Sequence, residues 1–239
     1  MELLRIANMT SLEGPDDAKP INSYIFDPSG DLTLVVGLRS DTEPEFPWRF
    51  TVCSATLRRA SLVWNKMLYG GWAESKKTTI CRGSSNMDQQ EDDQWTVELP
   101  EDDPKALAVV MNIIHGHFDK VPAATGDEMT IELLYDVLVA CNKYDLTKIV
   151  RPWIKGWMEI AKRTPDTTET PSDRSSFTIY STYIAWEVGD EDLFKARFIE
   201  LCKHVEVNED GHLAMPGNID LTKIDHIGPS DLVGKPIRS

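Results

Sequence analysis

The sequence lacks the features by which several classes of protein are recognised. Its 239 residues include only four cysteines, which lie far apart with no C-x-x-C spacing: Cys53, Cys81, Cys141 and Cys202. This pattern argues against a disulfide scaffold or a zinc ribbon and indicates a reducing compartment. No apolar run approaches the length of a membrane span, and residues 1–17 hold only a broken apolar stretch, too short for a signal-peptide core. We therefore expect an intracellular protein of the cytoplasm, the nucleus or both, with no secretion signal and no membrane partner.

Positive charge is also scarce. The chain has 25 Lys and Arg residues against 39 Asp and Glu residues, which gives a formal net charge of -14. Long-range repulsion from phosphate backbones then makes nucleic acid a poor partner. The two basic pairs are interpreted as solvated helix faces, and not as localisation signals or phosphate clamps; they are Arg58 with Arg59 and Lys76 with Lys77.

Catalytic and metal-binding motifs are missing as well. The sequence has no G-x-S-x-G elbow, dinucleotide-type glycine triplet, H-E-x-x-H or EF-hand loop. His115 and His117 do not face each other at the end of a helix, so we interpret them as structural or solvent-exposed. Residues 228–235, GPSDLVGK, have the wrong glycine spacing for a phosphate-binding loop and predict a turn. We predict no enzyme, no metal and no cofactor, and a cryptic enzyme is the least favoured alternative.

The sequence does contain an ordered series of periodic segments. Alternation of apolar and polar residues predicts strands, and a period near 3.6 predicts helices. Asp103 followed by Pro104 is a strong helix start, because the carboxylate accepts a first-turn amide and proline lacks a donor where none is needed. The first two strands predict a hairpin. The predicted strands are 31–37, 48–53 and 95–99, and the predicted helices begin near residues 54, 103, 130, 148, 176 and 190.

These segments predict a mixed domain of the α+β class, in which a small sheet is capped by helical hairpins and followed by further helices. Residues 163–175 are rich in Thr, Pro and Asp and predict a linker. Residues 82–94 lack apolar periodicity and predict a disordered insertion. The predicted divisions are a flexible N-terminal arm at 1–27, the domain at 28–162, the linker at 163–175 and a C-terminal helical extension at 176–239.

The order of these elements and four local phrases resemble the BTB/POZ domain family. DLTLVVG at 31–37 resembles its first strand, and SLVWNKMLYGGWAES at 61–75 resembles its S-x-x-F-x-x-M-x-x-G-x-x-E helix. VELPEDDPKALAVVMNIIHG at 97–116 resembles its strand, Leu-Pro, Asp-Pro and helix, and ACNKYDL at 140–146 resembles its A-D-K-Y-x-L helix end. The resemblance extends over about residues 31–157, and the sequence of these phrases is most similar to that of short stand-alone BTB proteins of filamentous fungi.

The sequence departs from the family's pattern at several places. Trp64 stands where Phe is commoner, Cys53 and Ser54 stand where the family usually has His-Lys, and Asn142 replaces the Asp of A-D-K-Y. The sequence shows no clear counterpart of the long amphipathic helix that precedes the first strand in dimeric, transcription-factor-type members. This departure argues against the strand-swapped homodimer of that family.

The resemblance implies a protein-interaction module, an adaptor that self-associates or links a client to a cullin-type ubiquitin ligase scaffold. The alternative is a self-assembling scaffold with no ubiquitin role. In that family the scaffold is bound by the third strand, the next helix and the adjacent helical pair. The sequence contains no kelch, zinc-finger or MATH-like substrate reader, so in an adaptor the helical segment 177–205 is expected to recruit the client. Trp72 is the tryptophan most expected to be exposed. The candidate interface residues are Trp72, Trp95, Val97, Leu99, Leu107, Val110, Asn142, Tyr144 and Asp145.

Overall fold

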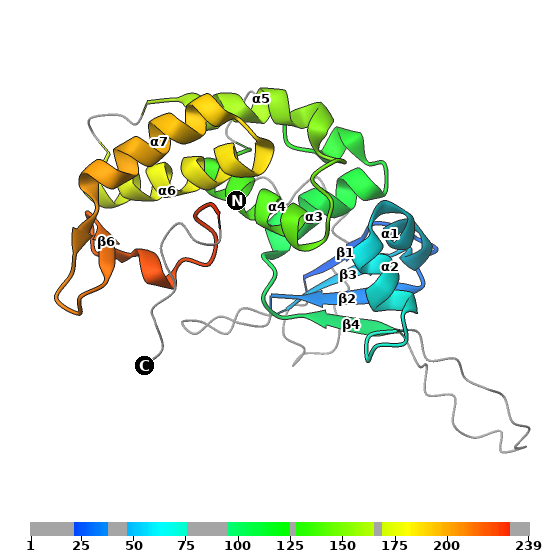
Figure 1. Cartoon of the computed structure of the whole chain (residues 1–239). Coiled ribbons are helices and arrows are strands. Elements are labelled where there is room, and N and C mark those ends of the chain that lie inside the picture. Colours follow the sequence, from blue (N-terminus) through cyan, green and yellow to red (C-terminus); the bar gives the residue numbers. More distant parts are fainter. Residues whose placement is uncertain (1–21, 38–46, 76–94, 125–127, 165–168, 230–239) are drawn as a thin grey trace, which may run out of the picture. The chain divides into compact units, whose positions relative to one another are not determined.

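The computed structural model contains strands and helices in two compact units (Figure 1). Unit 1 combines Met1–Val121 with Lys143–Ile149, and unit 2 combines Pro122–Asn142 with Val150–Ser239. The structure describes residues 22–37, 47–75, 95–124, 128–164 and 169–229. The expectation of a mixed α/β chain with a small sheet is confirmed. Within the described ranges, no helix has the length and apolar character that crossing a bilayer requires.

A four-stranded sheet forms the base of unit 1, in the order β1–β3–β2–β4. β2 and β3 pair antiparallel, as the predicted hairpin requires, whereas β4 runs parallel to β2 and β1 runs parallel to β3. All five side chains of β2 are buried, because this central strand is covered on both faces, while β4 alternates between exposed and buried. The bounds are β1 Ser23–Ile25, β2 Leu32–Val36, β3 Trp48–Val52 and β4 Thr96–Leu99.

β1 corrects the predicted start of the domain. Residues 1–27 were expected to form a flexible arm, and residues 1–21 lie outside the described residues. Ser23–Ile25 pairs with β3, and the rings of Tyr24 and Phe26 pack on Phe50 with centroids 5.8 and 5.1 Å apart. The apolar run 24–26 is too short to show an alternation, so only its pairing with β3 identifies it as a strand. The predicted insertion at 82–94 also lies outside the described residues.

The helix predicted from Ser54 to the glycine pair is in fact two helices, α1 at Ser54–Ala60 and α2 at Leu62–Tyr69. Ser61 separates them with an extended backbone, φ -144° and ψ 135°, and its hydroxyl accepts the Trp64 N–H at 3.1 Å. A serine that bonds to nearby backbone amides starts a new helix more readily than it continues an old one. The two helices lie side by side in Figure 1.

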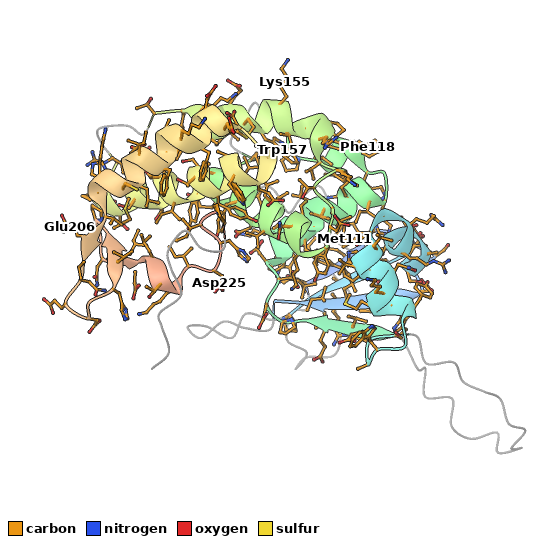
Figure 2. The ribbon with its side chains drawn as sticks, in the orientation of Figure 1. Met111, Phe118, Lys155, Trp157, Glu206 and Asp225 are labelled. Atoms are coloured by element: carbon orange, nitrogen blue, oxygen red, sulfur yellow. The ribbon has the colours of Figure 1, made fainter. Side chains whose placement is uncertain are left out.

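α3 spans Pro104–Ile114 and begins at the predicted cap, where Asp103 Oδ1 accepts the Ala106 N–H at 2.7 Å. Met111, labelled in Figure 2, is fully buried on its inner face. Beyond its end, His115 Nε2 lies 3.2 Å from the Cys53 amide nitrogen and its Nδ1 lies 3.0 Å from the Met111 carbonyl. Because the Cys53 N–H donates, Nε2 accepts and Nδ1 carries the proton. His115 is therefore a neutral structural group. The short 3-10 helix Phe118–Lys120 follows.

Four helices make up most of unit 2. Thr170 and Asp173 form a capping box at the start of α6, so part of the predicted linker 163–175 is helical, and its residues 165–168 lie outside the described part. Thr and Asp look like linker residues in a sequence, but at this spacing they begin a helix. Gly189 ends α6 and Asp190 caps the next helix, as predicted. The bounds are α4 Ile131–Lys143, α5 Arg151–Lys162, α6 Pro171–Val188 and α7 Glu191–His204.

A small antiparallel sheet follows the helices of unit 2, in the order β5–β6–β7, and the sequence analysis did not predict it. Its strands are β5 Glu206–Val207, β6 Leu213–Met215 and β7 Ile219–Asp220, and the 3-10 helix Leu221–Lys223 continues from the last. Strands of two or three residues cannot show a period. The sheet packs on α6 and α7 through a shared core of Ile179, Leu201, Met215, Leu221 and Ile227.

The end of α5 is held by Arg197, a buried arginine on α7. Its Nη2 donates to the carbonyls of Ala161 at 3.2 Å and Arg163 at 2.6 Å, and its Nη1 donates to Glu200 at 2.9 Å. The last carbonyls of a helix have no partner within the helix, and this guanidinium supplies one. Arg197 thereby joins α5 to α7.

The half-buried imidazole of His115 makes the stability of unit 1 depend on pH. Burial lowers the pKa of His115, and the hydrogen bond to Met111 opposes this only in part. Well above about pH 6.5 the His115 imidazole is neutral in both the folded and the unfolded state. Below it the unfolded chain takes up the proton first, so the free energy of unfolding decreases until the pH passes the lowered folded-state pKa. We expect His115→Gln to remove this acid-side loss.

Urea unfolding followed by tryptophan fluorescence between about pH 5 and about pH 7.5 measures this effect. The matched control is His204→Gln, because His204 is an exposed histidine of α7. We expect the control to lose stability with acid as steeply as the parent chain. Equal acid-side losses in the parent and in His115→Gln would show that His115 is not held neutral.

Candidate interaction surface

Five of the nine predicted interface residues belong to the core of unit 1. Their exposed fractions are 6% or less, so a partner cannot reach them while the unit stays folded; they are Val97, Leu99, Leu107, Val110 and Tyr144. The prediction that these side chains contact a partner is therefore corrected. The periodicities that identify these residues report their burial, and the family resemblance assigned the interface to the same elements without separating inner from outer faces.

The other four predicted residues are differently placed. Trp72 is 68% exposed, which confirms the expectation for it, and Trp95 is half-buried. Asp145 is exposed and holds a left-handed backbone with φ 52°. Asn142 belongs to unit 2, where its Nδ2 donates to Glu187 Oε2 at 3.0 Å. Trp72 and Trp95 remain as candidates on one surface of unit 1.

Tyr144 is the centre of a set of contacts between separate segments of unit 1, which we name the clasp. Its hydroxyl donates to Asp102 Oδ2 at 2.9 Å, and Lys143 Nζ lies 2.7 Å from the same oxygen. Its ring stacks on Trp64 with centroids 4.5 Å apart, and its carbonyl accepts the Ser61 hydroxyl at 2.5 Å. Burial and the Asp102 carboxylate raise the pKa of Tyr144 well above its usual range, so the hydroxyl stays a donor. The clasp joins α2 and the start of α3 to the segment Lys143–Ile149.

The outer side of α2 carries apolar side chains that this clasp does not use. Leu62, Lys66 and Tyr69 occupy positions i, i+4 and i+7, which face one way on a helix, and all three are exposed. Leu62 is 67% exposed and Tyr69 is 40% exposed. Arg58 and Trp95 contact Tyr69, and Trp95 also bonds to the turn after α2 that holds Trp72. We name this set of exposed and half-buried residues the aromatic–basic face: Arg58, Leu62, Lys66, Tyr69, Trp72 and Trp95.

Tyr69 is fixed at the centre of this face. The Ser54 hydroxyl donates to Asp31 Oδ2 at 2.8 Å, so it accepts from the Tyr69 hydroxyl at 2.6 Å. The Arg58 guanidinium lies 4.9 Å from the centre of the Tyr69 ring, and Trp95 meets that ring edge-on at 6.0 Å. A ring held on three sides loses little conformational entropy when a partner contacts it.

The turn at residues 71–75, which contains Trp72, is held by hydrogen bonds to α2 and to Trp95. The Ser75 hydroxyl accepts the amides of Gly71 and Trp72, each at 3.0 Å, and donates to the Met67 carbonyl at 2.9 Å. Trp95 Nε1 donates to the Glu74 carbonyl at 2.9 Å. The Trp72 indole is thus an exposed ring on a held backbone.

The sequence analysis missed four residues of the face, namely Arg58, Leu62, Lys66 and Tyr69. The signal that could have found them is the second stripe of α2, which runs on the side opposite Trp64 and Leu68. It was overlooked because two of its four members are basic, and basic residues on a helix are interpreted from sequence as a solvated face.

Unit 2 contains a cavity of about 240 Å³ beside the first turns of α6 and the end of α7. Its two acid–base candidates already have partners, since Glu200 accepts from Arg197 at 2.9 Å and His204 Nδ1 donates to the Glu200 carbonyl. The described residues place no group of three His, Cys, Asp or Glu side chains where a metal ion could be held. The lining consists of Pro171, Arg174, Ser175, Thr178, Glu200, His204, Met215 and Pro216.

The clasp leads to a prediction for Tyr144→Phe. Loss of the hydroxyl leaves the buried Asp102 carboxylate with one donor fewer, and an unmet buried acceptor costs about 1–3 kcal/mol. We expect the free energy of unfolding of unit 1 to decrease by that amount, measured by hydrogen exchange at the amides of β2. Tyr24→Phe is the matched control, because Tyr24 is also buried in unit 1 but its hydroxyl bonds to no described residue. Equal effects of the two changes would contradict a clasp.

Comparison of the chain with protein-family models finds no match, and comparison with curated proteins finds none either. The resemblance to the BTB/POZ family is therefore limited to the four quoted phrases and the order of elements. The exposed residues of the aromatic–basic face are the structural feature from which a function is argued.

Proposed function

We propose that this chain is a protein-interaction adaptor of the BTB/POZ type, with one surface for a cullin-type scaffold and another for a client. The observation that carries the proposal is the aromatic–basic face, where Leu62, Tyr69 and Trp72 are exposed together on a fixed support. Exposed apolar side chains grouped on a rigid element mark protein interfaces, and Trp, Tyr and Arg supply most of the binding energy there.

The order of elements supports the family relation. After β1, unit 1 runs β2, β3, α1, α2, β4 and α3, which is the strand, strand, helix, strand and helix order of the family, with the first helical region divided in two. The parallel pairing of β4 with β2 requires a crossover, which α1 and α2 supply. Three of the four phrases that resemble the family lie along these elements, and the fourth begins in α4, the next α-helix of the chain.

The scaffold surface of the proposal lies on the outward sides of β4 and α3. Family members bind the scaffold with the elements that correspond to β4 and α3. In this chain the inward side chains of β4 and α3 are buried. Thr96 and Glu98 on β4 and Lys105 on α3 are exposed instead. The aromatic–basic face lies mainly on α1, α2 and the turn after them, so it serves as the client surface. Client recruitment by the helical segment 177–205, which was expected from the sequence, stays a prediction beside this assignment.

The adaptor proposal predicts two separable binding events. The full chain, immobilised and passed through a filamentous-fungal cell lysate, should retain a cullin together with client proteins identified by mass spectrometry. Leu62→Ser combined with Trp72→Ala should still retain the cullin but lose the clients by about tenfold or more, since buried anchor residues dominate such interfaces. Both side chains are exposed, so the fold should be unchanged.

A control with matched polarity change is Ile199→Ser combined with Val207→Ser, two exposed apolar residues of unit 2, which should retain both kinds of partner. Light scattering on the purified chain separates the alternative. Oligomers without cullin retention would replace the adaptor by a self-assembling scaffold. A monomer that retains neither cullin nor client would show that the chain is not an interaction module.

A further inference from the structure

The charge of unit 1 is unevenly distributed along the chain. Residues 47–73 contain no Asp or Glu, although the whole chain has a net charge of -14. The same stretch contains Arg49, Arg58, Arg59 and Lys66, and it includes all of α1 and α2. The carboxylate of Glu74 is the first to follow, in the exposed turn beside Trp72. The two helices therefore form a cationic region on an otherwise acidic protein.

This positive charge coincides with the exposed apolar side chains. Lys66 lies between Leu62 and Tyr69 on the outer stripe of α2, and the Arg58 guanidinium packs on the Tyr69 ring at 4.9 Å. Neither Arg58 nor Lys66 makes an ion pair with a described residue. Their charges are therefore not neutralised by carboxylates of the described part of the chain.

We propose that the aromatic–basic face binds a short acidic linear segment of a client protein, in which Asp or Glu residues flank an aromatic or aliphatic side chain. This inference rests on the proposed function and names the chemistry of the client. The apolar side chain of the segment packs beside Tyr69, and the rest of the segment extends along α2 toward Leu62 on one side and toward Trp72 on the other. Its carboxylates meet Arg58 and Lys66, so the charges of the two partners are complementary.

Nucleic acid is the other anionic polymer that a basic, aromatic surface suits. The net charge of -14 disfavours it, because a nucleic acid extends far beyond the face and meets the acidic remainder of the protein. A short peptide contacts only the face. Salt screens charges that lie more than about 10 Å away, so the basic residues of the face dominate the electrostatic energy of a peptide bound there. The face favours a peptide for this reason.

Selection from a random linear peptide display library against the immobilised full chain tests the inference. We expect the enriched peptides to carry an excess of Asp and Glu around Leu, Phe or Trp. The most enriched peptide, labelled with fluorescein, should bind the chain in fluorescence polarisation with an affinity that falls several-fold between about 50 mM and about 300 mM salt. Arg58→Glu combined with Lys66→Glu should weaken that affinity by about tenfold or more.

The matched control reverses two charges elsewhere, Lys155→Glu on α5 and Lys203→Glu on α7, and should bind like the parent chain; Lys155 is labelled in Figure 2. Both control lysines are exposed, so the two double variants carry the same total change in charge. Circular dichroism of the four chains confirms that the folds are equal. The neutral pair Arg58→Gln with Lys66→Gln should bind with intermediate affinity.

Several results would overturn the inference. Enriched peptides with no acidic excess, or binding that both charge-reversed double variants weaken equally, would do so while leaving the interaction module intact. Tighter binding of a fluorescein-labelled single-stranded DNA than of the peptide would assign the face to nucleic acid. Dimers that Arg58→Glu with Lys66→Glu dissolves would assign it to a second copy. Failure to enrich any peptide rejects the inference, whereas loss of the proposed function also requires that no cullin or client be retained from the lysate.

Discussion

The buried hydrogen bond between the Tyr144 hydroxyl and Asp102 is the interaction on which the rest of unit 1 depends. Asp102 precedes α3, and Tyr144 stacks on Trp64 from α2 and accepts the Ser61 hydroxyl that separates α2 from α1. Tyr144 therefore contacts α2 both at its N-cap and on its inner face. Because Trp64 faces inward, the stripe of Leu62, Lys66 and Tyr69 must face outward. The candidate surface is thus the reverse side of a helix whose inner side is clamped.

Much of this fold could be predicted from local patterns. The alternation at Leu32, Leu34 and Val36 identified the central strand, and the Asp103 cap and the Gly189 end defined two helix boundaries correctly. These features succeed because their causes are local: a short run rich in apolar and β-branched residues between turn residues favours a strand, and a helix end needs a partner for its own amides or carbonyls. Burial of all five side chains of β2, Thr33 and Val35 included, was not predicted. The distinction between the inner and outer faces of those elements depends on what packs against them, which is not local.

The parts that could not be predicted are those whose cause lies far away in the sequence. β1 exists because Tyr24 and Phe26 meet Phe50, and three residues alone contain no pattern that says so. Ser61 breaks the helix partly because its hydroxyl reaches the Tyr144 carbonyl, 83 residues away. The same reason applies to the interface prediction. Val97 and Leu107 were assigned to a partner because the family places its scaffold on β4 and α3, whereas their burial shows that they stabilise the unit itself.

Net charge and local charge lead to different conclusions about partners. A charge of -14 opposes a long polyanion, because every part of the protein contributes to repulsion over the length of the ligand. The same total says little about a ligand the size of one helix face, since charges beyond about 10 Å are largely screened at ordinary ionic strength. Only the described placement of Arg58 and Lys66 beside Leu62 and Tyr69 decides that case. A protein acidic in total thereby offers a local surface for an acidic peptide, and its remaining acidic surface then disfavours longer anions and adds selectivity.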